Sequence, residues 1–207
     1  MYRAARRLPP DVRREQLLAI AVELAARDGY SGFSLDELTE RAGVTRNLVY
    51  RYFPRGRIDL YLAVVERAGE EITRGWITDR ERPVAERMDA NFERMAAHAS
   101  GPSDEWVIHR QVQTSDEPEI IAVGERYLNR IIDVIALNQL GTDDPPPLAR
   151  IAIASYLAFT ETALDRARRA GIPLEELRPL ITQTLVAAMS AGPATESSPN
   201  RAAEGRA

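Results

Sequence analysis

The sequence of 207 residues has no cysteine and no lysine, and only 6% of its residues are aromatic. Without cysteine the chain can form neither a disulfide framework nor a thiolate metal site. No apolar run approaches the roughly 20 residues that a membrane-spanning helix requires. The N-terminal stretch MYRAARRLPPD is basic but has no hydrophobic core of the kind that defines a signal peptide. We therefore expect a soluble cytoplasmic protein with no cofactor, no metal and no membrane partner.

Motifs of common enzyme classes are missing as well. The sequence contains only two histidines, and it has no G-x-G-x-x-G fingerprint, no P-loop and no H-E-x-x-H motif. The acidic pairs 70–71 and 175–176 are neighbours in sequence, so their side chains leave a helix in different directions, as solvated residues do. The acidic pair 143–144 lies in a proline-rich loop and has no partner motif. An enzyme is therefore not expected, and a small helical enzyme is the least favoured alternative.

The charge is distributed unevenly along the chain. Residues 1–67 hold 12 arginines and 9 acidic residues, a net of +3, and residues 68–207 hold 15 arginines and 22 acidic residues, a net of −7, which together give the overall −4. A basic end on an acidic protein is typical of nucleic-acid contact. Arg3, Arg6 and Arg7 precede a Pro-Pro break, and they form either an arm that reaches the minor groove or a disordered tail that phosphate attracts weakly.

Residues 34–60, SLDELTERAGVTRNLVYRYFPRGRIDL, have the pattern of two short helices joined by a tight turn. Ser34 is a suitable N-cap, and Glu37 three residues later completes a Ser-x-x-Glu capping box. Gly43 can adopt the left-handed conformation that ends a helix, and Thr45 can cap the next one. Two helices of about seven or eight residues, separated by about three residues, have the spacing of a helix-turn-helix.

Between Arg41 and Arg57 the sequence has five arginines and no Asp or Glu. In the major groove an arginine can bridge guanine O6 and N7 and an asparagine can pair with adenine N6 and N7, so Arg46 and Asn47 are the expected base readers. Hydroxyl groups and further arginines suit phosphate oxygens. The expected DNA-contacting residues are Ser34, Thr45, Arg46, Asn47, Tyr50, Arg51, Arg55 and Arg57. The alternative is a hairpin of solvated arginines, or a helical adaptor whose basic hairpin binds an acidic partner.

The segment GFSLDELTERAGVTRNLVYRYFPRGRIDLYLAVV resembles the DNA-binding domain of the TetR family of bacterial transcriptional regulators. The shared features are a preceding helix that ends in Arg-Asp-Gly-Tyr, the AGV turn at residues 42–44, LVYRYF at 48–53 and the DLYLAVV entry into a fourth helix. The resemblance covers about residues 10–66. It implies an all-α homodimer with an N-terminal three-helix DNA-binding domain and a C-terminal domain for ligand binding and dimerisation.

Carried over by position, the resemblance makes residues 45–47 base or phosphate contacts and Tyr50 a phosphate contact. It adds Tyr52 as a backbone contact or as a brace for the helix. Most members have a phosphate-binding lysine at the start of the fourth helix. The linker before that helix is a residue longer than the commonest form, so either Arg55 or Arg57 takes the position of the lysine. An arginine there keeps the charge and changes the geometry.

Helical patterns continue along the rest of the chain, and no segment alternates as a strand would. Besides the helix-turn-helix, we expect helices at about 11–27, 58–76, 83–99, 104–114, 118–139, 148–169 and 174–189. An all-α fold follows, with an arm and a helix-turn-helix domain in residues 1–57 and a helical ligand-binding and dimerisation domain in residues 58–190. Residues 191–207 are poor in large apolar side chains and are expected to form a disordered tail.

The last two expected helices carry apolar and small residues at helical spacing. Packed across a two-fold axis with those of a second chain, they would form a four-helix bundle. The alternative is ordinary core packing within one chain. The expected dimer-interface residues are Ile151, Ala154, Ala158, Thr162, Leu177, Ile181, Leu185 and Met189.

The middle helices carry aromatic residues and a few polar ones, and apolar walls with few polar anchors are typical of a small-molecule site. The candidate pocket residues are Phe92, Met95, Trp106, His109, Arg110, Gln113, Tyr127, Arg130, Tyr156, Phe159 and Glu161. An apolar effector with an anionic group would suit His109 and Arg110. The alternative is a satisfied core histidine beside surface arginines.

These patterns predict a ligand-responsive repressor, cytoplasmic and nucleoid-associated, that binds a near-palindromic operator as a dimer. Its expected partners are double-stranded operator DNA, a second copy of the chain and an unknown small-molecule effector. The helix expected over residues 58–76 links the two domains and is the expected lever between them.

Overall fold

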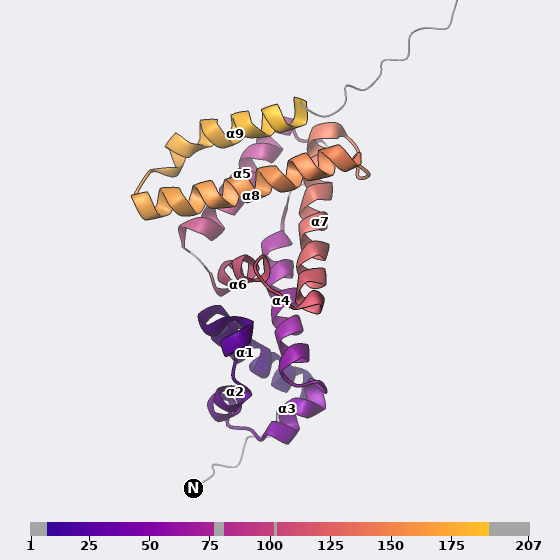
Figure 1. The fold of residues 1–207 in the computed structure, drawn as a ribbon, viewed down its shortest axis with the longest axis vertical. Helices are drawn as coiled ribbons and strands as arrows, with labels where there is room; N and C mark the ends of the chain where they lie inside the picture. The colour runs from indigo at the N-terminus through magenta and orange to yellow at the C-terminus, as the bar shows by residue number, and fades with distance from the viewer. Residues whose placement is uncertain (1–7, 77–80, 102, 191–207) are drawn as a thin grey trace, which may run out of the picture.

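The computed structural model describes residues 8–76, 81–101 and 103–190. Within these ranges the chain is all-helical, as the sequence predicts, and no strand occurs (Figure 1). The helices are α1 (Pro10–Gly32), α2 (Leu35–Ala42), α3 (Arg46–Tyr52), α4 (Arg57–Thr73), α5 (Val84–Ser100), α6 (Asp104–Val112), α7 (Pro118–Leu140), α8 (Pro147–Ala170) and α9 (Leu174–Ser190). The predicted basic arm with Arg3, Arg6 and Arg7 and the predicted tail lie outside the described residues. In the described ranges, none of the helices combines the length and the apolar character that a bilayer span needs.

One end of the molecule is formed by α1, α2, α3 and the first turns of α4 (Figure 1). Each of these helices presents an apolar face to its neighbours, because its apolar residues recur at helical spacing. Leu17, Leu38, Val49 and Phe53 are fully buried in the core that these faces share. The helical dihedrals of α1 break at Gly29, with φ 65° and ψ −176°, which is where the sequence places the end of this helix.

A second core lies among α5, α7, α8 and α9 at the other end of the molecule, where α8 and α9 pack along each other (Figure 1). The long helix α4 reaches both cores, with Val64 in the first and Ile72 in the second. The short helix α6 also joins them, with Ile108 in the first core and Trp106 in the second. Both α4 and α6 therefore connect the two ends mechanically.

The first core extends across the predicted domain boundary between residues 57 and 58. Val64 of α4, Ile108 of α6 and Ile120 of α7 belong to the same core as the buried residues of the helix-turn-helix. The helix-turn-helix unit thus rests directly on α6 and on the start of α7. A division of the chain at residue 57 stays a prediction, and the packing does not mark it.

Helices α4 and α7 approach each other closely where Gly69 faces Tyr127. A Cβ atom on Gly69 would lie 2.3 Å from Cδ2 of Tyr127, far inside van der Waals contact. The Tyr127 ring is buried, and the guanidinium carbons of Arg126 and Arg130 each lie 5.5 Å from its centroid. The missing side chain at Gly69 is what allows the aromatic ring to lie flush against α4.

Candidate nucleic-acid interface and effector-domain cavities

Helix α2 begins as the sequence predicts, with Ser34 as its N-cap. The amide of Glu37 donates to the Ser34 hydroxyl oxygen at 3.4 Å, which satisfies one of the unpaired donors of the first turn. The second hydrogen bond of the predicted capping box, from the Ser34 amide to the Glu37 carboxylate, does not form. The Glu37 carboxylate binds Arg27 of α1 instead, because a guanidinium at 2.6 and 2.9 Å is a stronger partner than the Ser34 amide.

The turn between the two helices depends on Gly43. Its φ of 63° and ψ of 38° lie in the left-handed region, which other residues adopt at a cost. The Gly43 amide donates to the Glu40 carbonyl at 3.1 Å and the Val44 amide donates to the Thr39 carbonyl at 3.0 Å. This hydrogen-bond pair closes α2 as a Schellman motif and turns the chain into α3.

Helix α3 has a buried side and an exposed polar side. Val49 is buried, and the half-buried Tyr52 packs against the first core, which supports its role as a brace. Thr45 occupies the N-cap with extended backbone angles, but its side chain makes no capping bond, so the predicted cap is right in position only. The exposed side consists of Thr45, Arg46, Asn47, Tyr50 and Arg51. These are the residues that the sequence predicts as the DNA-contacting face of this helix.

Three of the five arginines in the acid-free stretch are neutralised by carboxylates from elsewhere in the chain. Arg46 binds Asp36 of α2 through two contacts of 2.8 and 2.6 Å, and Arg41 pairs with Glu23. Arg55 binds Asp59 at 2.6 Å and also pairs with Glu119 of α7 at 2.9 Å. The carboxylates in these pairs are those of Asp36, Glu23, Asp59 and Glu119. The absence of acids within the stretch thus does not leave all its arginines unpaired, because folding brings these acids to it from outside the stretch.

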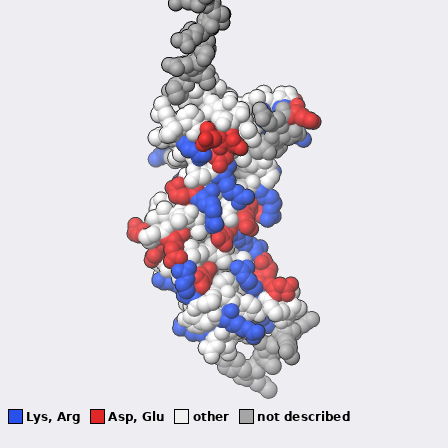
Figure 2. Space-filling model, turned by 90° about the vertical axis from the view of Figure 1, so that its right-hand side faces the viewer, with Lys and Arg blue, Asp and Glu red and all other residues white. Residues whose placement is uncertain are grey.

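Arg51 and Arg57 have no ion pair with any described residue. Arg51 is exposed in the last turn of α3. The guanidinium of Arg57 lies 4.6 Å from the ring centroid of Tyr30 and borders a polar cleft of about 530 Å³ between the helix-turn-helix unit and the α6–α7 connection. At the lower end of the face shown in Figure 2, where Figure 1 places α2 and α3, the coloured residues include blue ones and no red ones.

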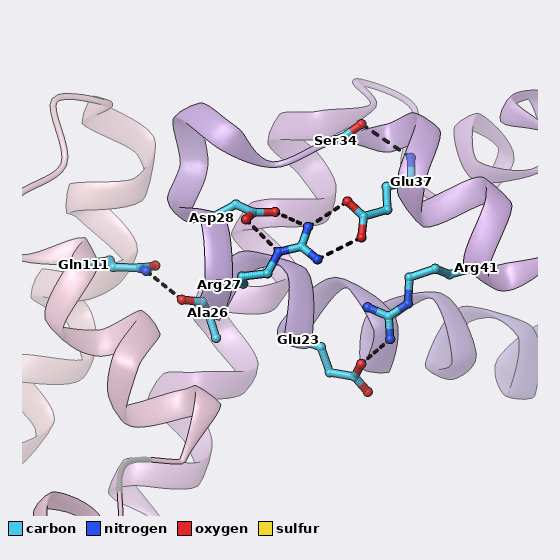
Figure 3. Close-up of polar contacts among 8 residues, drawn as sticks. All are labelled: Glu23, Ala26, Arg27, Asp28, Ser34, Glu37, Arg41 and Gln111. Carbon is cyan, nitrogen blue, oxygen red and sulfur yellow. Dashed lines mark hydrogen bonds and ion pairs between the residues drawn. The ribbon is translucent and has the colours of Figure 1, made fainter.

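Helices α1, α2 and α6 are tied together around Arg27 (Figure 3). The Arg27 guanidinium donates to Asp28 at 2.7 and 2.6 Å and to Glu37 of α2 at 2.9 and 2.6 Å. These hydrogen bonds hold the pKa of both carboxyls below their usual values. One residue earlier, the carbonyl of Ala26 accepts a hydrogen bond from Nε2 of Gln111, on α6, at 3.0 Å (Figure 3). The orientation of the first helix of the pair is thus linked to α6.

Comparison with known proteins agrees with this geometry. Residues 17–64 match the family model described as bacterial regulatory proteins, tetR family. Residues 17–64 are thus similar to the N-terminal domain of that family. The curated protein "HTH-type transcriptional activator FasR" of Mycolicibacterium smegmatis is 40% identical over 73 residues, which make up 35% of this chain and 33% of that protein. The match thus spans about a third of the relative's length.

Solved structures of TetR-family proteins share the fold along most of the chain. A tetR-family transcriptional regulator from Streptomyces coelicolor superposes with a TM-score of 0.71 at 22% identity, over 88% of this chain and 82% of that one. A TetR-like regulator from Rhodococcus sp. RHA1 gives 0.67 at 18% identity, over 89% and 100%. E. coli NemR in its reduced form gives 0.62 at 17% identity, over 86% and 96%. At these identities the likeness concerns the fold, and it confirms the predicted all-α TetR-type architecture.

The C-terminal part of the chain contains a larger and a smaller cavity. The larger one, of about 140 Å³, lies among α5, α7, α8 and α9, and the predicted pocket residues Phe92, Met95 and Tyr156 line it. The smaller one, of about 20 Å³, lies beside α6, and Trp106 and His109 line it together with Met95. The sequence treats all these residues as one site, whereas the structure divides them between two cavities that share a wall.

Five other predicted pocket residues line neither of these two cavities, and Arg110 and Gln113 among them belong to the cluster described in the next paragraph. Tyr127 and Arg130 belong to the α4–α7 contact described above, and Phe159 is exposed on the outer side of α8. Helical periodicity alone could not separate these faces, because an aromatic residue suits a helix–helix contact, a cavity wall and an interface equally well.

The remaining polar residues of the predicted pocket form one cluster around a buried carboxylate, between α8 and the C-terminal end of α6. The Glu161 carboxylate of α8 is only 6% exposed and accepts three hydrogen bonds, two from α6 and one from its exposed C-cap residue Gln113. Nε2 of His109 donates at 2.9 Å, a guanidinium nitrogen of Arg110 at 2.8 Å and the amide of Gln113 at 2.7 Å. Burial raises the pKa of Glu161, but the hydrogen bonds and charge of these donors outweigh it and bring the pKa below its usual value.

The Glu161 cluster corrects the predicted role of His109 and Arg110. The sequence assigns them to the anionic group of an effector, whereas in the structure they bind a carboxylate of the chain itself. A sequence interval of about fifty residues separates the donors from Glu161, so no local pattern could pair them. The cluster ties α6 to α8, and an external anion would have to displace Glu161 to use the same donors.

The predicted dimer-interface residues also separate into two groups. Ile181 and Leu185 are buried inside the chain and line the larger cavity, so they cannot contact a second chain. Ala154, Leu177 and Met189 are partly buried against the second core. The exposed predicted residues are Ile151, Ala158 and Thr162. The inner face of α9 is therefore core, and the exposed residues lie on the opposite sides of these helices.

Asp36 restrains the predicted base reader Arg46, which gives a testable consequence. Replacing Asp36 with asparagine should strengthen DNA binding about two- to fivefold at low salt. The substitution removes a negative charge near phosphate and leaves Arg46 free to turn to a base; an exposed ion pair contributes little to stability, so folding should be unaffected. Fluorescence anisotropy with labelled duplex measures this. Glu40→Gln on the same helix is the matched control, and weaker binding by Asp36→Asn would show that Asp36 positions Arg46 for readout.

Proposed function

We propose that this protein is a ligand-responsive transcriptional regulator that binds near-palindromic double-stranded DNA as a homodimer. The observation that supports this most is the two-sided character of α3. Its apolar side is fixed to the first core by Val49, while arginine, asparagine and hydroxyl groups project from the other side. A short helix of this size, capped and presented by a partner helix, fits the major groove with its N-terminal end first.

In the proposed complex Arg46 leaves Asp36 and bridges a guanine, and Asn47 pairs with an adenine. Thr45, Tyr50 and Arg51 bind phosphate oxygens on either side. The Thr45 hydroxyl is available because it makes no capping bond. We assign the position of the family's phosphate-binding lysine to Arg57, since Arg55 is held by two carboxylates.

We propose that the dimer forms through the outward sides of α8 and α9. Large apolar residues are exposed there, with Ile151 at 62% and Val186 at 58%. The exposed apolar residues of this surface are Leu148, Ile151, Phe159, Leu180 and Val186. A second copy fits this surface, because the two helices already pack along each other and two such pairs form a four-helix bundle around a two-fold axis. The same two-fold axis would relate the recognition helices.

We propose repression as the direction of regulation. A dimer bound over a promoter excludes polymerase with no further contact, whereas activation needs an additional surface for the transcription machinery. The relative that is 40% identical over 73 residues carries the name of an activator. Transcription in vitro from the selected operator decides between the two, because a repressor lowers the number of transcripts and an activator raises it.

Ligand response would act as a population shift, with the ligand favouring a conformation whose recognition helices are wrongly spaced for DNA. The sequence predicts α4 as the lever, and α6 offers a second connection. Glu161 holds α6 from the cavity side, while Gln111 on the same helix donates to Ala26 and accepts from the Tyr61 hydroxyl at 3.4 Å. Burial raises the pKa of Tyr61 to about 12, so the hydroxyl keeps its proton and remains a donor.

Selection of bound sequences from a random DNA pool tests the proposed function. We expect a near-palindrome with two related half-sites, and much weaker binding to a duplex that contains one half-site. At the selected site, Arg46→Ala or Asn47→Ala should weaken binding about tenfold to a hundredfold and relax the preference at one position. Tyr50→Phe and Arg51→Ala should weaken binding similarly on every sequence, and Arg51→Ala should also reduce its salt dependence.

Equal losses for all four variants on selected and random DNA would contradict the assignment of base readers. A failure to enrich any sequence would contradict the regulator itself. Binding of acidic proteins but not of DNA at moderate salt would instead support an adaptor whose basic hairpin recognises an acidic partner.

A further inference from the structure

Arg87 of α5 is a buried cation with little to balance it. Only 5% of the residue is exposed, and its guanidinium donates to Oδ1 of Asn138, on α7, at 2.7 Å. Its Nε atom is buried and has no hydrogen-bond partner. No carboxylate among the described residues forms an ion pair with it. A buried charge and a buried unpaired donor are both unfavourable, so the position of Arg87 requires an explanation, and a bound ligand is one.

Arg87 does not itself line the larger cavity, but it lies directly behind a residue that does. Asn138, its partner, lines the cavity, and so do Met88 and Asn91 from the same stretch of α5. Other lining residues are apolar, with Ile135 and Ile181 among them. The volume of about 140 Å³ is close to that of the engineered apolar cavity of about 150 Å³ that binds benzene. The space thus suits an apolar body of about six carbon atoms.

We infer that this cavity binds a small apolar monocarboxylate whose carboxylate group accepts hydrogen bonds from Arg87. One cation that already donates to Asn138 can balance one negative charge, which favours a carboxylate over a doubly charged phosphate. The acidic residue on the cavity wall does not compete for Arg87, because the Asp89 carboxylate accepts from Arg178 at 3.2 Å. The inference rests on the proposed ligand response, and it moves the anion site from His109 and Arg110 to Arg87.

A purely structural role for Arg87 is the competing explanation. Asn138 lies in the last turn of α7, where the unpaired carbonyls of the helix carry partial negative charge. Arg87 could serve as a cation at this helix end and nothing more. The two explanations differ in one respect: only a ligand site distinguishes a carboxylate from a neutral molecule of the same shape.

Calorimetry with the full chain at pH 7.5 tests the inference, with benzoate and hexanoate as probes. Benzamide and hexanamide are their uncharged counterparts. We expect each acid to bind about tenfold or more tightly than its amide, because a hydrogen bond to a charged group is stronger than one to a neutral group. Trp76 lines the cavity, so its fluorescence should change on binding and provides a second readout. Acids and amides that bind equally, or acids that do not bind, would overturn the inference without any variant.

Substitutions then locate the anion site. Arg87→Met keeps the length of the side chain and removes the charge, so the preference for acid over amide should disappear. Arg94→Met is the matched control, because Arg94 lies on the same helix and its Nε is also buried without a partner, but it lines the smaller cavity. The control should keep the preference; its loss in Arg94→Met instead would place the anion beside α6 and overturn the assignment. Ile181→Phe narrows the cavity and should weaken acid and amide alike.

The ligand site and the regulator are tested separately. Calorimetry is done without DNA, and DNA affinity is measured with and without benzoate or hexanoate. Acids that bind through Arg87 and leave DNA affinity unchanged support the site and contradict the proposed ligand response. Loss of sequence-specific DNA binding in Arg46→Ala, with acid binding unchanged, would show that the two ends fail independently.

Discussion

Replacing Glu161 with alanine is expected to lower the free energy of unfolding by about 2–4 kcal/mol. The change leaves His109 and Arg110 of α6, and Gln113 directly after it, without their acceptor at a site where Glu161 is only 6% exposed. Removing one partner of a buried ion pair typically costs about 3–5 kcal/mol. The Arg110 side chain is 36% exposed and can recover some hydration, which places the expected loss somewhat lower. Urea denaturation followed by circular dichroism measures it.

The matched control is Asp133→Ala, which removes a carboxylate that joins the neighbouring pair of helices. Asp133 of α7 accepts from Arg150 of α8 at 2.8 Å, but its side chain is 40% exposed, so its loss should cost less than about 1 kcal/mol. Equal losses in the free energy of unfolding for the two substitutions would mean that burial does not increase the contribution of Glu161 to stability. An unchanged stability of Glu161→Ala would contradict the cluster as an anchor of α6.

The pH dependence of stability identifies the charge of Glu161 as the cause. Its pKa in the folded protein lies below the usual 4.5, so the unfolded chain takes up this proton first as the pH falls. The stabilisation from the carboxylate is therefore complete above about pH 4.5 and is lost as the pH falls through the folded-state pKa. Glu161→Gln removes this contribution. Its stability relative to the wild type should be lowest at neutral pH, and the difference should shrink toward pH 3.

The helix-turn-helix could be predicted from the sequence because its determinants are local. The Ser34 cap, the left-handed Gly43 and the buried spacing through Val49 act within one or two helical turns. The same holds for the bounds of most later helices, which proline and glycine mark. At the other extreme, the pairing of Arg46 with Asp36 depends on how one helix crosses the next, and the sequence pattern carries no such information.

The burial of Ile181 and Leu185 could not be predicted for a related reason. An apolar stripe on the last helix suits a dimer interface and an intrachain core equally, and only the packing of α9 on α8 decides between them. The sequence did not predict any role for Arg87. Arginine is common in this chain, and nothing in its neighbours indicates burial, whereas the folded chain buries it against Asn138, which lines a cavity.

Gly69→Leu is expected to destabilise the protein by about 3 kcal/mol or more, at the upper end of the cost of overpacking. In an open helix the same change would stabilise by about 1 kcal/mol, because glycine is a poor helix former. Here a Cβ atom would lie 2.3 Å from Cδ2 and 2.4 Å from Cγ of Tyr127, so α4 and α7 must separate. Gly69→Ala should show the same sign with a smaller size. A stabilised Gly69→Ala protein would contradict the close approach of the two helices.

A second substitution tests whether the loss of stability comes from the contact between positions 69 and 127 or from a general destabilisation of α4. Tyr127→Ala alone should be destabilising, because it empties a buried site, but in combination with Gly69→Leu the losses should be much less than additive. The new leucine would occupy the volume of the ring. If Gly69→Leu also lowers DNA affinity at a temperature where the protein is folded, and Tyr127→Ala restores it, then the α4–α7 contact controls the orientation of the recognition helix. Restored stability without restored DNA affinity would instead leave α6, through Gln111 and Ala26, as the connection that carries the signal.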